Sequence, residues 1–256
     1  MNLNNLSIIE KDRSEKAPAK KDAFREAYLL WLNKEGNLFS DAETALLPTV
    51  KKSHPGFRQW KTKKQCLKRL MRNIAQKDTP VNILEIGCGN GWLSAQLARV
   101  TAGMVVGIDI SAQGIAQAKR VFGNIPNLTF MVTDFRRDCL PVEKFDLVVI
   151  SASIEYFSSF TELINMALNK LTLMGEIHIV ASRLYQQEEI VSARNKQRAG
   201  FASLGVPSMS RYYFLHTLED LATYHFKILF DPNHWMNKLI PRSSNLHHIL
   251  IKNHYH

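Results

Sequence analysis

Residues 81–182 alternate between short apolar runs and longer segments in which apolar residues recur every three or four positions. Short apolar runs bounded by turn residues are typical of buried strands, and the longer period is typical of the helices that cover them. The alternation predicts an α/β protein with a doubly wound, mostly parallel sheet that is covered on both faces. The expected parallel strands are 81–86, 104–109, 128–132, 145–150 and 176–181.

The segment after the fifth strand predicts two further strands and an insertion. Apolar runs at 225–230 and 246–252 flank a loop at 231–245, and we expect them to form an antiparallel pair that completes a seven-stranded sheet. An insertion at about 183–224 precedes them. Within it we expect a helix at 186–199, a loop at 200–210, and a second helix that starts at Thr217, because Thr217-Leu-Glu-Asp220 has the form of a capping box.

The first 80 residues predict a helical extension. Residues 21–33 place apolar side chains on one face, 36–55 has the turn residues of a long connection, and an amphipathic helix follows Trp60. We therefore divide the chain into an N-terminal helical cap at 1–80 and an α/β domain at 81–256. In this cap, Phe57 and Trp60 either close a pocket or pin the helix to the core.

Positive charge is concentrated near the N-terminus. The chain has a net charge of +10, and residues 49–77 hold ten basic side chains and no acid. Such a segment predicts contact with an anion, namely RNA, an acidic lipid surface or a phosphorylated substrate. The alternative is a solvated helix face with no specific partner.

Composition narrows the class of protein. No apolar run approaches the ~20 residues of a membrane helix, and the N-terminus lacks the features of a secretory signal. The three cysteines are too scattered for a disulfide framework or a zinc motif. The nine histidines, including His247-His248 and the His254/His256 pair, do not form a recognisable ligand set with acids or cysteines, so we expect no metal. These features favour a cytoplasmic protein.

The loop after the first expected strand carries the strongest chemical signal. Residues 84–91 read Leu-Glu-Ile-Gly-Cys-Gly-Asn-Gly, with three glycines in five residues before a helical pattern that starts at Trp92. Bare backbone at the start of a helix can approach a nucleotide-type ligand closely. The pattern is not a dinucleotide fingerprint, because position 92, where that fingerprint has glycine, is tryptophan.

Acids follow the next two strands. Asp109 ends the second strand, 18 residues after Gly91, and Asp134 follows the third. A carboxylate at such a position can accept hydrogen bonds from both hydroxyls of a ribose. Each acid alone has an ordinary alternative role, because aspartate favours turns and helix starts, so the prediction depends on the joint pattern.

With these motifs in this order, residues 80–182 resemble the class I S-adenosylmethionine-dependent methyltransferases, whose sheet is Rossmann-like with an antiparallel last strand. The resemblance implies that Gly87, Gly89 and Gly91 meet the methionine and ribose of S-adenosylmethionine, and that Glu85 orders the loop and the amino end of methionine. We count Cys88 in the same cofactor-binding loop, as a small turn residue and not a nucleophile, because only the helix N-terminus nearby could lower its pKa. It also implies that Asp109 binds the ribose, Ile110 covers adenine, Asp134 accepts from the adenine amino group beside Phe135, and Ser151 borders the methionine.

The same resemblance implies methyl transfer by in-line displacement, which leaves S-adenosylhomocysteine. Glu155, just after the fourth strand, is our first candidate for a polar substrate contact or base, and His216 is the second. In the resembled family, insertions like 183–224 cover the active site. Candidates to line it are Tyr185, Arg194, Arg198, Tyr212, Tyr213 and His216.

Three functions remain open from the sequence. The first is a methyltransferase that acts on an oxygen, nitrogen or carbon of a small molecule. The second is an RNA methyltransferase that uses the basic 49–77 segment, and the third is a non-catalytic S-adenosylmethionine-binding protein. The intact motifs favour an enzyme, although cofactor motifs alone do not prove turnover.

Overall fold

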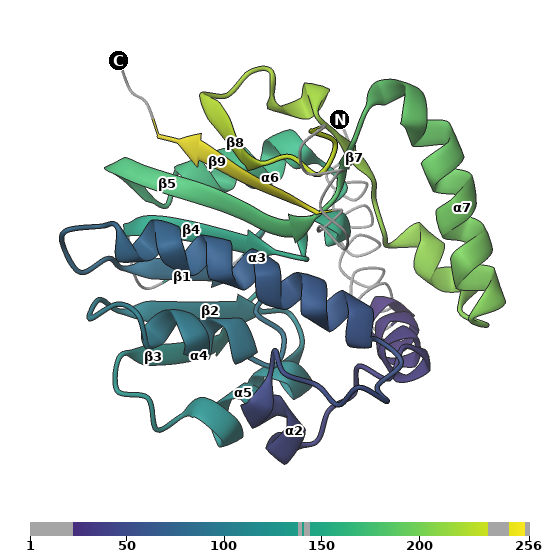
Figure 1. Cartoon of the computed structure of the whole chain (residues 1–256), viewed down its shortest axis with the longest axis horizontal. Coiled ribbons are helices and arrows are strands. Elements are labelled where there is room, and N and C mark those ends of the chain that lie inside the picture. Colours follow the sequence, from purple (N-terminus) through teal and green to yellow (C-terminus); the bar gives the residue numbers. More distant parts are fainter. Residues whose placement is uncertain (1–22, 138–139, 141–143, 235–245, 254–256) are drawn as a thin grey trace, which may run out of the picture.

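The computed structural model describes residues 23–137, 140, 144–234 and 246–253. Its centre is a seven-stranded sheet in the order β3-β2-β1-β4-β5-β9-β8, with β1 to β5 parallel and β9 antiparallel to both β5 and β8 (Figure 1). This confirms the predicted doubly wound sheet and its antiparallel last strand. The strands are β1 (Ile83–Ile86), β2 (Val105–Asp109), β3 (Leu128–Val132), β4 (Phe145–Ser151), β5 (Leu171–Ser182), β8 (Phe226–Phe230) and β9 (His247–Lys252).

Helices cover both faces of the sheet. One face packs against α3 (Phe57–Ala75), α4 (Trp92–Ala98) and α5 (Ala112–Phe122), and the other packs against α6 (Phe160–Leu168). Successive residues of a strand point to opposite faces, so Ile83 and Leu147 join the first cluster while Leu84 and Val148 join the second. Because both faces are covered, the central strands β1 and β4 carry apolar residues toward both faces and do not alternate with polar ones throughout.

The helix α3 belongs to the same core as the sheet. Its residues Leu67, Leu70 and Ile74 are buried in the cluster that contains Ile83. The predicted amphipathic helix is therefore confirmed and begins slightly earlier, at Phe57. The division of the chain at residue 80 stays a prediction. Among the described residues, no helix has the length and apolar character needed to cross a membrane.

The long connection predicted at 36–55 was incomplete as a description, because it contains α2 (Asp41–Leu46). This helix begins with a reciprocal capping box, in which Ser40 Oγ accepts from the backbone N–H of Glu43 and the Glu43 carboxylate accepts from the backbone N–H of Ser40. The helix is short and has one buried residue, Thr44, so it gives almost no apolar periodicity. Its capping box was the signal that could have found it.

The insertion differs from its prediction at two places. A single 3-10 turn, η2 (Gln187–Glu189), precedes α7 (Ile190–Ser203), which continues into the segment predicted as loop, and η3 (Pro207–Arg211) follows. The predicted helix at Thr217 is wrong. Thr217 lies in β7 (His216–Thr217), which pairs with β6 (Leu184–Tyr185), and only the 3-10 turn η4 (Glu219–Leu221) follows.

The carboxyl ends of the parallel strands form the edge at which a ligand is expected. The strand order reverses between β1 and β4, because β2 and β3 follow on one side of β1 while β4 and β5 lie on the other. Figure 1 shows the helix at residues 23–34 and α7 beyond this same end of the sheet. The fold thus brings the N-terminal helices and the insertion to the strand ends that carry the predicted motifs.

Candidate active site

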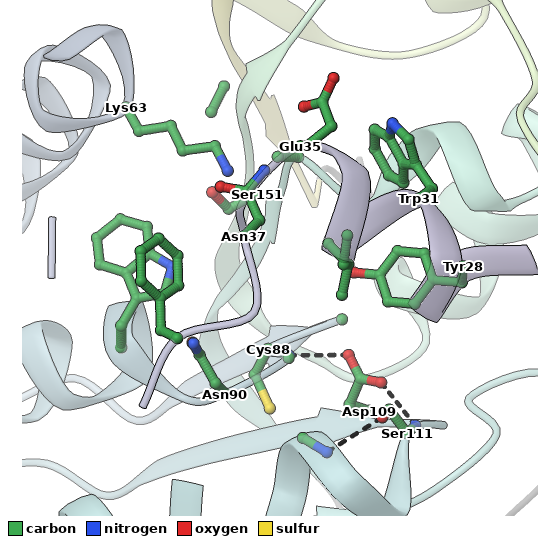
Figure 2. A pocket seen from close by; sticks show the side chains of 18 of the residues that line it. Tyr28, Trp31, Glu35, Asn37, Lys63, Cys88, Asn90, Asp109, Ser111 and Ser151 are labelled. Carbon is green, nitrogen blue, oxygen red and sulfur yellow. Dashed lines mark hydrogen bonds between the residues drawn. The ribbon is translucent and has the colours of Figure 1, made fainter. Parts of the chain in front are cut away.

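A cavity of about 880 Å³ lies at the carboxyl ends of β1, β2, β4 and β5, a size typical of small-ligand sites (Figure 2). Its walls come from the loop after β1, the turn after β4, the helices before the sheet and the insertion. Of the predicted site residues, those that line it are Glu85, Gly87, Cys88, Gly89, Asp109, Ser151 and Glu155. Those that do not are Gly91, Ile110, Asp134, Phe135 and His216.

The three motif glycines have positive φ but different surroundings. A Cβ added at Gly89 would meet no atom within 4 Å, so this part of the loop offers bare backbone to the cavity. A Cβ on Gly91 would instead lie 2.6 Å from the Phe130 ring. Gly91 is the N-cap of α4, and its lack of a side chain serves the packing of that helix.

Asp109 holds the glycine loop and the next helix start. Its carboxylate accepts hydrogen bonds from the backbone N–H groups of Gly89 at 2.8 Å and Ser111 at 2.7 Å. Burial raises the pKa of Asp109, and backbone hydrogen bonds from Ser111, Gly89 and Ile110 oppose that shift. A carboxylate has about four lone-pair positions. The Asp109 carboxylate therefore keeps acceptor capacity for a ligand that offers hydroxyl donors.

Two further groups of the loop are buried. Glu85 accepts a hydrogen bond from the Ser94 hydroxyl, and burial raises the pKa of Glu85 to about 7. Burial, reinforced by the charges of Glu85 and Asp109, raises the pKa of the Cys88 thiol. The thiol therefore stays protonated at neutral pH, which does not suit a nucleophile.

The residues predicted at adenine lie outside the cavity. The buried Asp134 carboxylate forms ion pairs with Arg136 Nε at 3.1 Å and Arg137 Nε at 3.8 Å. Phe135 is buried in the core cluster on the α6 face of the sheet. The roles of Asp134, Phe135 and Ile110 in adenine binding therefore stay predictions from the resemblance.

Glu155 is a buried titratable group that lines the cavity from the turn after β4. It lies in the 3-10 turn η1 (Ile154–Tyr156) after β4, is 7% exposed, and accepts a hydrogen bond from Ser182 Oγ at 3.3 Å. Burial raises the pKa of Glu155 to about 7, against the opposing effects of its hydrogen bonds and the positive charge of Lys63. A carboxyl group with this pKa can both take up and release a proton near neutral pH.

His216 is not brought to the cavity. Its Nε2 lies 3.1 Å from the Ile154 carbonyl oxygen, and its ring packs against Phe160. Burial lowers the pKa of His216, so the ring is held neutral at the turn after β4. His216 thus packs beside the turn after β4 and does not line the cavity, and its predicted role as a base stays a prediction.

Other histidines are buried in the sheet. His178 Nδ1 lies 3.0 Å from His248 Nε2 across the β5–β9 pair. Among the residues that the structure describes, no group of three or more His, Cys, Asp or Glu side chains is arranged to hold a metal ion. His254 and His256 lie outside the described residues.

Aromatic side chains form the wall around Glu155. Tyr156 contacts Tyr28 edge-to-face with ring centroids 5.4 Å apart, and Tyr213 contacts Tyr156 at 5.9 Å. Burial raises the pKa of all three tyrosines, so each presents a neutral hydroxyl. Of the insertion candidates, Tyr185 and Tyr213 line the cavity, whereas Arg194, Arg198, Tyr212 and His216 do not.

Several cavity residues were missed by the sequence analysis. They come mainly from the helices before the sheet, and their spacing was the available signal. Tyr28, Trp31 and Glu35 share one face at three- and four-residue steps. Trp60 lines the cavity, whereas Phe57, named with it, does not. The missed residues are Trp31, Glu35, Asn37, Lys63, Asn90 and Arg183.

Backbone strain also gathers at this cavity. Ala152 and Ala181 have φ values of 49° and 58°, and both line it. Positive φ is uncommon for residues other than glycine and tends to cluster at functional sites. Ala152 directly follows β4, and Ala181 lies near the carboxyl end of β5.

Comparison with known proteins relates residues 83–172 to methyltransferases. Residues 83–172 match the family described as "Methyltransferase domain". Malonyl-[acyl-carrier protein] O-methyltransferase 1 of Ilyobacter polytropus is 34% identical over 97 residues, covering 38% of this chain and 36% of that protein. Ribosomal protein L11 methyltransferase of Dechloromonas aromatica is 39% identical over 67 residues, covering 26% and 20%. The chain thus spans about a third or less of the length of these curated relatives.

Similarity to solved structures supports the same fold. The plantazolicin methyltransferase BpumL, in complex with a monoazolic desmethylPZN analog and SAH, aligns with a TM-score of 0.51 at 22% identity, covering 84% of this chain and 98% of that one. At this identity the likeness concerns the fold alone. The cavity itself fits the adenosyl cofactor of the family, because a bare glycine loop faces a carboxylate with free acceptor positions. Residues 83–172 are therefore similar to the methyltransferase domain family, which agrees with the resemblance to class I S-adenosylmethionine-dependent methyltransferases that the motifs indicated.

Proposed function

We propose that this chain is a methyltransferase that uses S-adenosylmethionine to methylate an oxygen, nitrogen or carbon of a small-molecule acceptor. The observation that carries the proposal is one continuous cavity. The same cavity is lined by the Gly89 backbone and the Asp109 carboxylate and by Glu155 and an aromatic wall. A cavity of about 880 Å³ has room for a cofactor with a small acceptor beside it.

The glycine loop and Asp109 would hold the cofactor. Asp109 would accept hydrogen bonds from the ribose hydroxyls, because its hydrogen bonds from backbone N–H groups leave acceptor positions of the carboxylate open. The Gly87–Gly89 backbone would approach the ribose and methionine, and Ser151 would border the methionine. When bound, S-adenosylmethionine supplies an electrophilic methyl group on sulfur, and the protein's part is orientation.

Glu155 and the tyrosines around it would prepare the acceptor. Glu155 would take up the proton that an oxygen or nitrogen acceptor releases as it is methylated, since its pKa of about 7 matches the working pH. Tyr156 and Tyr213 would exclude water from the acceptor and offer hydroxyl donors to its oxygens. Removal of water strengthens the electrostatic interactions within such a site.

The acceptor class stays a proposal, as does RNA as an alternative acceptor. The two curated relatives are named for different acceptors, one an acyl-carrier protein and the other a ribosomal protein. In the basic 49–77 segment, Lys61, Lys64 and Lys68 are exposed, which leaves an anionic partner open. RNA binding through these residues would weaken steeply with salt. Cofactor binding without transfer to any acceptor would support the non-catalytic alternative.

Calorimetric titration with S-adenosylmethionine and S-adenosylhomocysteine tests the cofactor site. We expect micromolar binding by the natural chain and a loss of about 100-fold or more in Asp109→Ala, because hydrogen bonds to a charged group contribute roughly 1.5–3 kcal/mol each. Asp78→Ala is the matched control, since Asp78 is exposed and distant from the lining residues. Circular dichroism must show that both variants are folded. If neither ligand binds the folded natural chain, the proposed function is wrong.

A further inference from the structure

One lysine of the basic segment does not behave as a surface residue. Lys63 is half-buried and lines the cavity, whereas its neighbours Lys61 and Lys64 are exposed. Position 63 is in phase with the buried stripe of α3, which continues at Leu67 and Leu70. An apolar residue is expected at such a position. The charge is therefore directed into the molecule by the periodicity of the helix itself.

The ammonium group of Lys63 has no direct anionic partner in the described part of the chain. It lies 4.4 Å from the centre of the Trp60 ring, a cation–π contact that fixes the side chain. Among the described residues, neither a hydrogen bond nor an ion pair within 4 Å holds its Nζ. Burial lowers the pKa of Lys63, and the more distant Glu35 and Glu155 carboxylates oppose that shift.

Two neutral donors lie beside this ammonium group. Figure 2 shows Lys63, Asn37 and Ser151 converging on the same part of the cavity, and Lys63 and Ser151 also share the small recess beside it. The Asn37 amide oxygen accepts from Trp60 Nε1 at 3.0 Å, so the Asn37 NH₂ group remains as a donor. An ammonium, an amide NH₂ and a hydroxyl together match the acceptor positions of a carboxylate.

We propose that Lys63, with Asn37 and Ser151, forms a carboxylate-binding site inside the cavity. The inference rests on the proposed function and deepens it, because these three residues line the same cavity as Asp109 and Glu155. Two molecules of the reaction can supply the carboxylate: the methionine end of the cofactor, or an acidic acceptor. In both cases Lys63 positions a reactant, and the bound anion replaces the water that burial has removed from the ammonium group.

Replacement of Lys63 distinguishes these sources. The test compares the natural chain with Lys63→Met and with Lys68→Met, a control with the same loss of charge at an exposed position of α3. The ligands are S-adenosylhomocysteine, 5′-deoxy-5′-methylthioadenosine, which lacks the amino-acid carboxylate, and benzoate added to the S-adenosylhomocysteine complex. Affinities are measured by calorimetry, with benzylamine as the cationic counterpart of benzoate.

We expect Lys63→Met to weaken one carboxylate ligand at least tenfold. If it weakens S-adenosylhomocysteine but leaves methylthioadenosine within twofold, the site holds the cofactor. If it leaves S-adenosylhomocysteine unchanged but weakens benzoate, the site holds an acidic acceptor. Unchanged affinity for both carboxylates, an equal loss in Lys68→Met, or tighter binding of benzylamine than of benzoate would overturn the inference. Failure of the natural chain to bind S-adenosylhomocysteine would instead reject the proposed function.

Discussion

Gly89 and Gly91 belong to one glycine motif but have different surroundings, so alanine substitutions at the two positions should have different effects. Both have positive φ, 55° and 77°, and an alanine in this conformation costs about 1 kcal/mol. Their surroundings differ, because a Cβ at Gly89 would face open space while one at Gly91 would lie 2.6 Å from Phe130 ring atoms and 2.7 Å from the Ala118 Cβ. Such overpacking adds about 1–3 kcal/mol. We therefore expect Gly91→Ala to lower the free energy of unfolding by about 2–4 kcal/mol and Gly89→Ala by about 1 kcal/mol.

Binding should show the opposite order. Gly89→Ala places a methyl group in the cavity, so we expect a folded protein with a large loss of affinity for S-adenosylhomocysteine. In Gly91→Ala, the molecules that remain folded should bind nearly as well as the natural chain. Urea unfolding followed by circular dichroism gives the stabilities, and calorimetry at low temperature gives the affinities.

A double variant checks the stated cause. Phe130→Leu removes the ring atoms nearest the new methyl group, so Gly91→Ala should destabilise the Phe130→Leu protein less than it destabilises the natural chain. Strict additivity of the two changes would mean that the ring contact is not the source of the loss. Equal destabilisation by Gly89→Ala and Gly91→Ala would refute the division between a cavity glycine and a packing glycine.

Two further predictions concern pH. Once an acceptor is found, kcat should rise with pH through about 7 as Glu155 loses its proton. Glu155→Gln should flatten this profile, and it should lower kcat by roughly 10²-fold or more if the acceptor needs a base. An unchanged profile in the variant would remove Glu155 from the mechanism. Burial first, and then the nearby His178, lowers the pKa of His248 from 6.5 to about 3. The unfolded chain thus takes up a proton near pH 6.5 that folded His248 refuses until about pH 3, so its contribution to stability is complete above pH 6.5 and is lost as pH falls. Between pH 6.5 and 4.5 we expect a loss of about 2 kcal/mol that is smaller in His248→Gln; urea unfolding at both pH values measures it, and an equal loss in the variant would contradict the assignment.

The sheet could be predicted because its signals are local. Each strand is a short apolar run that ends at a turn residue, and Ser111 and Ser159 cap α5 and α6, the helices that follow β2 and β4. The helix predicted at Thr217 failed for a non-local reason. Asp220 Oδ2 does accept from the Thr217 N–H at 2.8 Å, as a capping acid would. Pairing of Thr217 with Tyr185, more than 30 residues earlier, holds the chain extended instead.

The part of the cavity that the strand ends form could also be predicted, whereas the part that the segments before the sheet form could not. Glu85, Asp109 and Ser151 lie at the ends of parallel strands, which must meet at one edge of a sheet whatever their separation in sequence. Trp31 and Asn37 reach the same cavity from segments before the sheet. Their positions depend on how those segments pack across the strand ends. The spacing in a single sequence shows which residues share a helix face, but not what that face packs against.

The basic residues of the 49–77 segment do not all lie on one face of a helix, so their number alone does not define an anion-binding surface. Its ten basic residues predict an anion-binding surface only if they share a face. In α3 they do not, because Leu67 and Leu70 turn one side to the sheet, Lys63 faces the cavity, and Lys68 faces solvent. The positive charge of the segment is therefore weaker support for RNA binding than its count of basic residues suggests. Lys63, which is half-buried and lines the cavity, has a more specific environment than the exposed lysines of the segment. A helix that belongs to the core can thus add one charge to the site while the rest of its charge keeps its outer face solvated.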